Sequence, residues 1–182
     1  MAYAYALITL ALCIAVAVLI AWSDRHPDRA IWPPRQFGFR ARITTWTVTV
    51  AAIGAAYLAG RAGWNAWNWP DFVRWYVGFP LTFVSSSVSS WAIVRLGLDQ
   101  SMGADNGLVT KSPFARTRNP TYLANVALCL GWVLLAASWP ALIAAAALAA
   151  LYAFAVPFEE RWLARTYGAA YEQYRANTPR WL

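Results

Sequence analysis

The sequence is poor in charge, cysteine and histidine, and each shortage excludes a class of protein. Only 13% of its 182 residues are charged and 60% are hydrophobic, whereas a soluble domain has about 25% charged and about 45–50% apolar residues. The chain therefore cannot cover a water-exposed surface, and its many aromatic residues exclude disorder. Two cysteines and one histidine are too few for a disulfide scaffold or for a zinc or iron site. These shortages predict an integral membrane protein that binds no metal.

Five apolar segments are long enough, or nearly so, to cross a bilayer as helices, which takes about 20 residues. They are residues 3–22, 43–60, 72–94, 120–137 and 139–157. The last two are separated by little more than Ser138, so we expect a tight antiparallel hairpin. Pro80 and Pro157 should bend the third and fifth helices. The serines at 85–90 and the alanines at 144–150 are interpreted as small faces for close helix packing.

The basic residues predict how the chain is oriented in the membrane. All but two of the fifteen Lys and Arg residues fall in the segments 25–42, 95–118 and 161–180, and the other two are Arg61 and Arg74. Because cytoplasmic segments are enriched in these residues, we expect the N-terminus outside and the C-terminus in the cytoplasm. The net charge of +7 would then face anionic lipid headgroups, and it does not indicate binding to nucleic acid.

The predicted fold is all-α, a polytopic membrane bundle of about five transmembrane helices followed by a cytoplasmic amphipathic helix at the C-terminus. We divide it into three N-terminal transmembrane helices, residues 1–94, and a C-terminal half, residues 95–182. No predicted span carries a charge near its centre, which argues against an ion or proton pathway. The strong preference for arginine over lysine suggests a bacterial chain, and hence the bacterial inner membrane.

Polar residues gather in two stretches on the predicted cytoplasmic side. The first, residues 107–122, contains Arg116 and Arg118 followed by Asn119 and Pro120. Asparagine at the N-cap and proline at the first helical position are typical of a helix start, and the free amides of a helix start attract anions. This predicts a binding site for a carboxylate or phosphate. On the residues alone, the arginines fit contacts with lipid phosphates equally well.

The second stretch begins with Glu159 and Glu160, directly after the fifth span. These carboxylates could hold a cation such as an ammonium group, or they could pair with Arg161 and Arg165. Four residues further on are spaced as one helical stripe: Leu163, Tyr167, Tyr171 and Tyr174. The stripe would pack on the bundle or attract a cation. Together the two stretches suit a ligand that carries both a carboxylate and an ammonium group.

Two motifs in a fixed order carry a family resemblance. They are Arg118-Asn119-Pro120-x-Tyr122 and Glu159-Glu160-x-x-Leu163, separated by a two-helix hairpin. On these motifs, the sequence resembles the isoprenylcysteine carboxyl methyltransferase and phospholipid methyltransferase superfamily over residues 95–182. The resemblance implies S-adenosylmethionine as methyl donor and a lipophilic or small acceptor reached through the membrane lipids. It also implies a fold other than the soluble Rossmann type.

The resemblance also implies roles for individual residues. The residues expected to bind the cofactor are Val109, Thr110, Phe114, Asn119, Pro120, Tyr122, Glu159 and Glu160. Arg118 and Arg180 are the candidate catalytic residues, because an arginine can orient an acceptor carboxylate through a bidentate pair. Such a carboxylate is already ionised near neutral pH, so it needs no general base. The residues expected to contact the substrate are Arg116, Tyr171 and Tyr174.

Two alternatives remain open at this point. Within the superfamily the acceptor could be a phospholipid amine, a thiol or an acid, and the sequence does not separate these. The chain could also be a non-catalytic membrane assembly protein that keeps the same fold.

Overall fold

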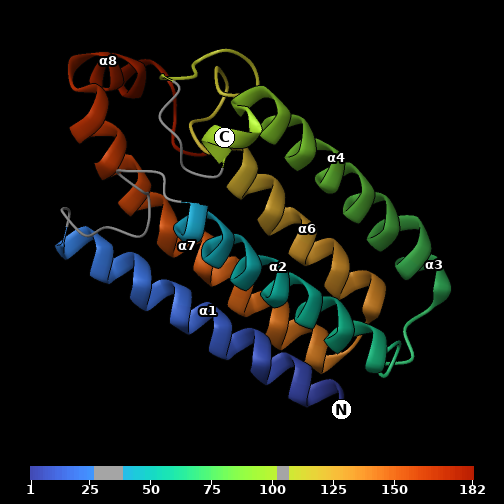
Figure 1. The fold of residues 1–182 in the computed structure, drawn as a ribbon. Coiled ribbons are helices and arrows are strands. Elements are labelled where there is room, and N and C mark those ends of the chain that lie inside the picture. Colours follow the sequence, from blue (N-terminus) through green and yellow to red (C-terminus); the bar gives the residue numbers. More distant parts are fainter. Residues whose placement is uncertain (27–38, 102–106) are drawn as a thin grey trace.

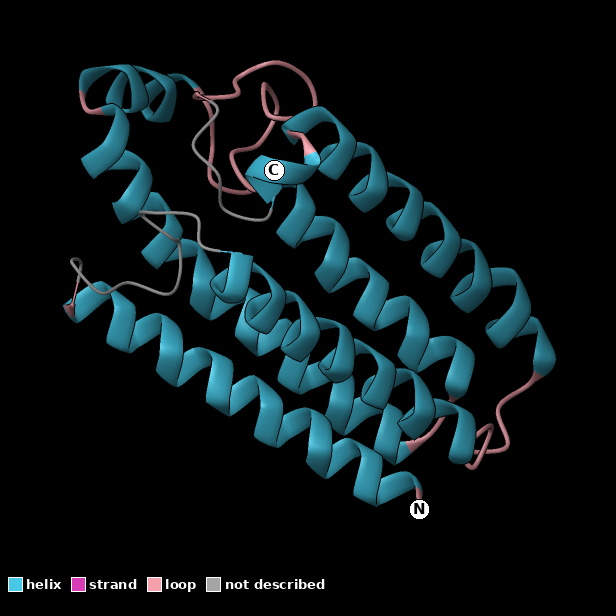
Figure 2. Ribbon diagram, in the orientation of Figure 1, coloured by secondary structure: helices cyan, strands magenta, loops and turns pink. Residues whose placement is uncertain are grey.

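The computed structural model describes residues 1–26, 39–101 and 107–182, and this part of the chain contains helices and loops but no strand (Figures 1 and 2). Its elements are, in chain order, α1 (Ala2–Arg25), α2 (Phe39–Ala62), α3 (Asp71–Val73), the π-helical turn η2 (Arg74–Gly78), α4 (Phe79–Leu96), α5 (Leu98–Ser101), α6 (Pro120–Ala136), α7 (Trp139–Tyr167) and α8 (Ala169–Asn177). Since α3, η2 and α4 follow one another without a break, they act as one long rod.

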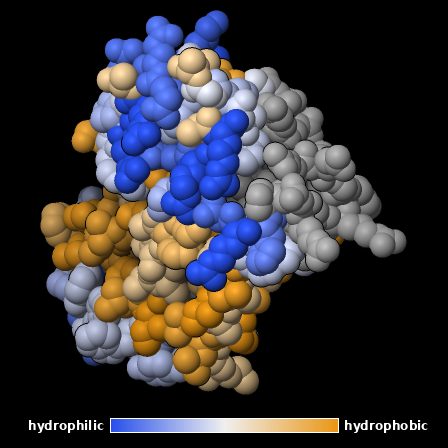
Figure 3. Space-filling model, turned by 90° about the vertical axis from the view of Figure 1, so that its left-hand side faces the viewer, coloured by the Kyte–Doolittle hydropathy of each residue, from blue (hydrophilic) through white to orange (hydrophobic). Residues whose placement is uncertain are grey.

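Among the described residues, three segments are long and apolar enough to cross a membrane: Ala2–Arg25, Asp71–Leu96 and Trp139–Tyr167. The apolar helix Pro120–Ala136 is shorter, and the predicted span 43–60 lies within α2. Figure 3 shows hydrophilic side chains gathered at the end of the bundle that carries α8, above a broad hydrophobic surface. The predicted all-α membrane bundle is thereby confirmed.

Helix α7 lies at the centre of the packing. It packs against α1, α2 and α6, while α4 packs mainly on α6 (Figure 1). Glycine allows the close approach of α6 to the rod: a Cβ atom at Gly131 would lie 2.7 Å from the Thr82 nitrogen, and one at Gly78 would lie 2.7 Å from the Leu135 nitrogen. Small residues at such crossings are typical of helices that associate in lipid.

The predicted hairpin is confirmed, but its second helix is longer than expected. Helix α6 ends at Ala136, and Ser138 caps α7 by accepting a hydrogen bond from the Ala141 amide at 3.4 Å. Helix α7 then continues through Pro157 to Tyr167 instead of ending at Pro157. A proline inside a membrane helix removes one backbone hydrogen bond, which neighbouring groups can compensate, and the residues after it favour helix. The second polar stretch is therefore presented on a rigid helix.

Pro80, the other proline expected to bend a helix, lies in the first turn of α4, where a proline is tolerated. This turn comes directly after the π-helical turn η2. Proline has no amide hydrogen to donate, and a single π-helical turn changes the local bonding pattern. The third predicted span thus contains a change of helix type at this point.

Candidate functional site

A cavity of about 640 Å³ runs from the α8 end of the bundle along α6 as far as Trp132, near the other end of that helix. Residues of α2, α4, α6 and α7 form its walls, and the loop after residue 107 and Tyr174 of α8 contribute to it as well. Sites for small molecules commonly have volumes of about 300–1,000 Å³. Helices α2 and α4 both line the cavity, while α4 packs mainly on α6, and α2 packs mainly on α1 and α7.

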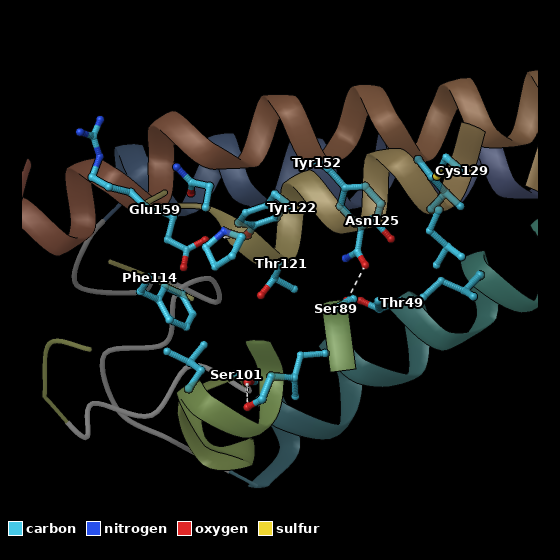
Figure 4. A pocket seen from close by; sticks show the side chains of 18 of the residues that line it. Thr49, Ser89, Ser101, Phe114, Thr121, Tyr122, Asn125, Cys129, Tyr152 and Glu159 are labelled. Atoms are coloured by element: carbon cyan, nitrogen blue, oxygen red, sulfur yellow. Dashed lines mark hydrogen bonds between the residues drawn. The ribbon is translucent and has the colours of Figure 1, made fainter. Parts of the chain in front are cut away.

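The polar head of the cavity is the pair of Glu159 and Tyr122. The Tyr122 hydroxyl donates a hydrogen bond to Glu159 Oε2 at 2.6 Å, and both residues line the cavity (Figure 4). The side chain of Tyr152 lies near the same place, with its ring centroid 6.1 Å from that of Tyr122. Glu159 therefore presents a carboxylate that is held by one neutral partner and is bordered by aromatic rings.

Glu160, the neighbouring residue, points elsewhere and is enclosed by three partners. Its Oε1 accepts from Arg118 Nε at 3.1 Å and from Asn119 Nδ2 at 3.3 Å. Its Oε2 accepts from Arg180 Nη2 at 2.6 Å and from Arg180 Nε at 3.1 Å. We call these four residues, Arg118, Asn119, Glu160 and Arg180, the clasp. The hydrogen bonds from Arg180 to Glu160 raise the pKa of the Arg180 guanidinium.

The clasp joins the loop before α6 to the end of the chain. The Arg118 amide donates to the Pro179 carbonyl at 2.9 Å, and Arg118 Nη1 donates to the Thr178 carbonyl at 2.6 Å. The Thr117 hydroxyl donates to the Arg180 carbonyl at 2.9 Å. These bonds hold residues 117–119 and 178–180 side by side.

Asn119 occupies the predicted N-cap position, but its side chain does not cap the helix. Pro120 follows it at the start of α6, as expected, while the Asn119 side chain makes no capping hydrogen bond. Asn119 Nδ2 donates instead to Glu160 and to the Arg180 carbonyl at 3.2 Å. The expected side-chain cap is thus wrong, because the clasp uses this amide. The amides of Thr121 and Tyr122 in the first turn consequently have no side-chain cap.

The aromatic stripe expected on one helix is divided between two. Helix α7 ends at Tyr167, Gly168 adopts a left-handed φ of 51°, and α8 begins at Ala169, so the single continuous helix is wrong. Glycine tolerates this backbone conformation without a steric penalty. Tyr171 is buried at 1% exposure, and Tyr174 lines the cavity and donates to the Phe114 carbonyl at 2.7 Å. Burial raises the pKa of both phenols to about 12.

The predicted site residues divide into three groups by position. Those that line the cavity are Val109, Phe114, Arg118, Asn119, Pro120, Tyr122, Glu159 and Tyr174. Those packed in or beside the clasp, outside the cavity wall, are Glu160, Arg180 and Tyr171. Thr110 and Arg116 are exposed and do not line the cavity. The two polar stretches are thus in direct contact, although only part of each faces the cavity.

The sequence reasoning missed a polar pair deeper in the cavity. Ser89 of α4 donates a hydrogen bond to Asn125 Oδ1 of α6 at 2.7 Å, and both residues line the cavity. Asn125 falls three residues after Tyr122, so the two share a helix face. An amide within an apolar span was the available signal. No group of three or more metal-ligating side chains is found among the residues described.

Comparison with known proteins identifies the family. The model of the phospholipid methyltransferase family matches residues 73–170, which include the rod's α4, the hairpin and both motifs. The chain is also 30% identical over 163 residues to the cobalt-zinc-cadmium resistance protein CzcN of Cupriavidus metallidurans, covering 86% of this chain and 70% of that protein. No solved structure matches. The resemblance seen in the sequence is confirmed, and the chain belongs to the phospholipid methyltransferase family of membrane proteins.

Proposed function

We propose that this protein is an S-adenosylmethionine-dependent methyltransferase that acts on a lipophilic or small acceptor bearing a carboxylate or thiol. One observation carries the proposal: Glu159, the uncapped start of α6 and an aromatic wall line the same cavity. The amino-acid end of the cofactor, with its ammonium and carboxylate, and the adenosine attached through the sulfur have matching partners there. When bound, the cofactor supplies a methyl group on a positively charged sulfur.

Of the two adjacent glutamates, Glu159 is the better partner for the cofactor's ammonium group. Its carboxylate faces the cavity and, among the residues that the structure describes, it is bonded to the neutral Tyr122 hydroxyl, whereas Glu160 is neutralised by Arg118 and Arg180. We assign the opposite charge, the cofactor's carboxylate, to the free amides of Thr121 and Tyr122 at the start of α6. Backbone amides and the helix dipole both favour an anion at this place.

Aromatic and aliphatic side chains at the head of the cavity suit the adenosine. Val109 and Phe114 of the loop and Tyr174 of α8 line this region, and the hydrogen bond from Tyr174 to the Phe114 carbonyl fixes both. The rings of Tyr122 and Tyr152 lie beside Glu159, where they can attract a sulfonium through cation–π interaction.

The contacts of Arg118 and Arg180 favour a positioning role for both. Arg118 binds Glu160 and the carbonyls of Arg175 and Thr178, and Arg180 binds Glu160 through two nitrogens. We propose that they hold the loop and the tail in place around the cavity. Catalysis then rests mainly on holding the two reactants close together. No general base is needed for an acceptor that is already ionised.

The same proposal includes the location of the site. The basic residues described at the α8 end of the bundle, such as Arg95, Arg161 and Arg175, favour a cytoplasmic position for that end by the positive-inside rule. We propose the inner membrane of a bacterium, with the N-terminus outside. We also propose that the acceptor arrives from the bilayer and enters the cavity between α2 and α4, which both line it.

Calorimetric titration of the purified protein with S-adenosylhomocysteine tests the proposal. We expect saturable binding to the wild-type protein. Glu159→Gln should weaken it about tenfold or more, because a hydrogen bond between charged groups contributes about 1.5–3 kcal/mol. The matched control is Glu172→Gln on α8, an exposed residue outside the cavity, which should bind like wild type. If the wild-type protein does not bind this ligand, the proposal fails.

A further inference from the structure

The polar pair of Ser89 and Asn125 lies between the polar head of the cavity and its mainly apolar part. Tyr122 and Glu159 lie on one side of Asn125 along the cavity (Figure 4). Further along α6 in the other direction, the lining is mainly apolar and aromatic and includes Trp132 and Tyr57, whose rings stack. Asn125 follows Tyr122 by three residues on α6, which places it about 4.5 Å further along the helix axis. A ligand that reaches from the apolar part to the head must pass this pair.

The hydrogen bond from Ser89 fixes the orientation of the Asn125 amide. An asparagine side chain carries an acceptor oxygen and an NH₂ group with two donor hydrogens. Ser89 Oγ donates to Oδ1 at 2.7 Å, so the oxygen has a partner. Nδ2 makes no hydrogen bond to any of the residues that the structure describes, and Asn125 is only partly buried on the cavity side.

The donor atom on the cavity lining selects the chemistry of its ligand. A hydrogen-bond donor favours a ligand group that can accept from it. A carboxylate or carbonyl oxygen can accept from Nδ2. A protonated amine is a donor only, and a thiol is a weak acceptor.

We infer that Ser89 and Asn125 form an oxygen-binding subsite for the methyl acceptor, and this inference rests on the proposed function. Asn125 Nδ2 donates to a carboxylate or carbonyl oxygen of the acceptor, while Ser89 holds the amide in the orientation that this requires. The apolar part of the cavity then takes the acceptor's hydrocarbon chain. The oxygen lies beside the pair of Glu159 and Tyr122, where we place the cofactor. The pair thereby favours oxygen-bearing acceptors over amines and thiols.

Binding of acceptor probes tests this subsite, and it is measured with saturating S-adenosylhomocysteine so that Glu159 is not available to an amine probe. Four probes of equal chain length are titrated into the protein in lipid nanodiscs: dodecanoate, methyl dodecanoate, dodecanethiol and dodecylamine. We expect the wild-type protein to bind the two oxygen-bearing probes most tightly. Asn125→Leu should weaken dodecanoate binding about tenfold, the loss of one hydrogen bond to a charged group, and leave dodecanethiol unchanged. Ser89→Ala should weaken dodecanoate binding about threefold, because the amide loses its tether.

Ser87→Ala is the matched control, since Ser87 lies on the same helix, is exposed, and bonds to the Phe83 carbonyl. It should leave all four affinities unchanged. Equal binding of the four probes by the wild-type protein, a preference for the amine, or unchanged dodecanoate binding in Asn125→Leu would each overturn the inference. If Asn125→Leu does not fold, Ser89→Ala decides the question alone.

Titration of the same variants with S-adenosylhomocysteine separates the two proposals. The subsite variants should bind it as the wild-type protein does, because neither side chain contacts Glu159. Absence of this binding in the wild-type protein would defeat the proposed function, whereas normal binding without selectivity among the probes would defeat the subsite alone.

Discussion

Glu159 and Glu160 are neighbours in the chain, yet they belong to two different regions of the molecule. Glu159 lines the cavity and is held by the Tyr122 hydroxyl. Glu160 lies in the clasp, where Arg118 and Arg180 neutralise it and Asn119 adds a further hydrogen bond. Successive residues of an α-helix point about 100° apart, so one turn of α7 serves both regions.

The comparison separates ligand binding from structural support. A carboxylate with two arginine partners has little left to offer a ligand, while a carboxylate that faces the cavity and is bonded to a neutral hydroxyl can still bind one. The motif Glu-Glu therefore combines a candidate ligand group with a group that holds the chain together. Each of the following predictions tests one side of this division.

The largest expected effect is on stability, in Glu160→Ala. The side chains of Arg118 and Glu160 are 9% and 8% exposed, and removing one member of a buried ion pair costs about 3–5 kcal/mol, because the other charge stays buried without a partner. The free energy of unfolding in mixed micelles measures this. The control is Glu172→Ala, whose pair with Arg175 is more than half exposed and should contribute less than about 1 kcal/mol. Equal losses in the two variants would mean that the clasp is not a structural element.

A smaller loss of stability is expected in Arg180→Ala. This side chain is 43% exposed, and ion pairs near the surface are worth about 1 kcal/mol or less. Glu160 also keeps Arg118 and Asn119 as partners. Unfolding measured under the same conditions should therefore place Arg180→Ala well above Glu160→Ala in stability. The reverse order would show that the tail, and not the buried pair with Arg118, dominates the clasp.

The smallest expected effect belongs to the cavity side, in Tyr122→Phe. This change removes the hydroxyl that holds Glu159 but leaves the carboxylate and the ring in place. The affinity for S-adenosylhomocysteine should fall about threefold, because Glu159 loses the group that positions it. The free energy of unfolding should fall by about 0.5–1.5 kcal/mol, the contribution of one hydrogen bond, which is well below the loss in Glu160→Ala. A large loss of stability without any change in affinity would move Glu159 to the structural side of the comparison.

The long apolar runs and the residues typical of helix starts predicted most of the fold. The apolar runs located the long helices, Ser138 marked the hairpin, and Asn119 followed by Pro120 marked the start of α6. The end of α7 was missed, because the apolar run that predicted the fifth span ends at Pro157 and the limit of that span was taken for the limit of the helix. The helix in fact ends ten residues later, before Gly168.

The site could be predicted only in part, because the sequence does not show which way a side chain points. The two motifs at the ends of the hairpin indicated that the two polar stretches meet. They did not indicate that Glu160 and Arg118 would form an ion pair with each other. Ser89 was read with its neighbours as a packing residue, and Asn125 was passed over within an apolar run. The packing of α4 against α6 brings Ser89 Oγ within 2.7 Å of Asn125 Oδ1, and the sequence does not show this packing.

The bonds between residues 117–119 and 178–180 also set an order of events in biosynthesis. These segments are separated in the chain by the whole hairpin of α6 and α7, so the wall around the cavity cannot close until both helices have been inserted and the tail has left the ribosome. A nascent chain, or one trimmed by a protease before Thr178, would therefore have its helices in the bilayer and yet lack every one of these contacts.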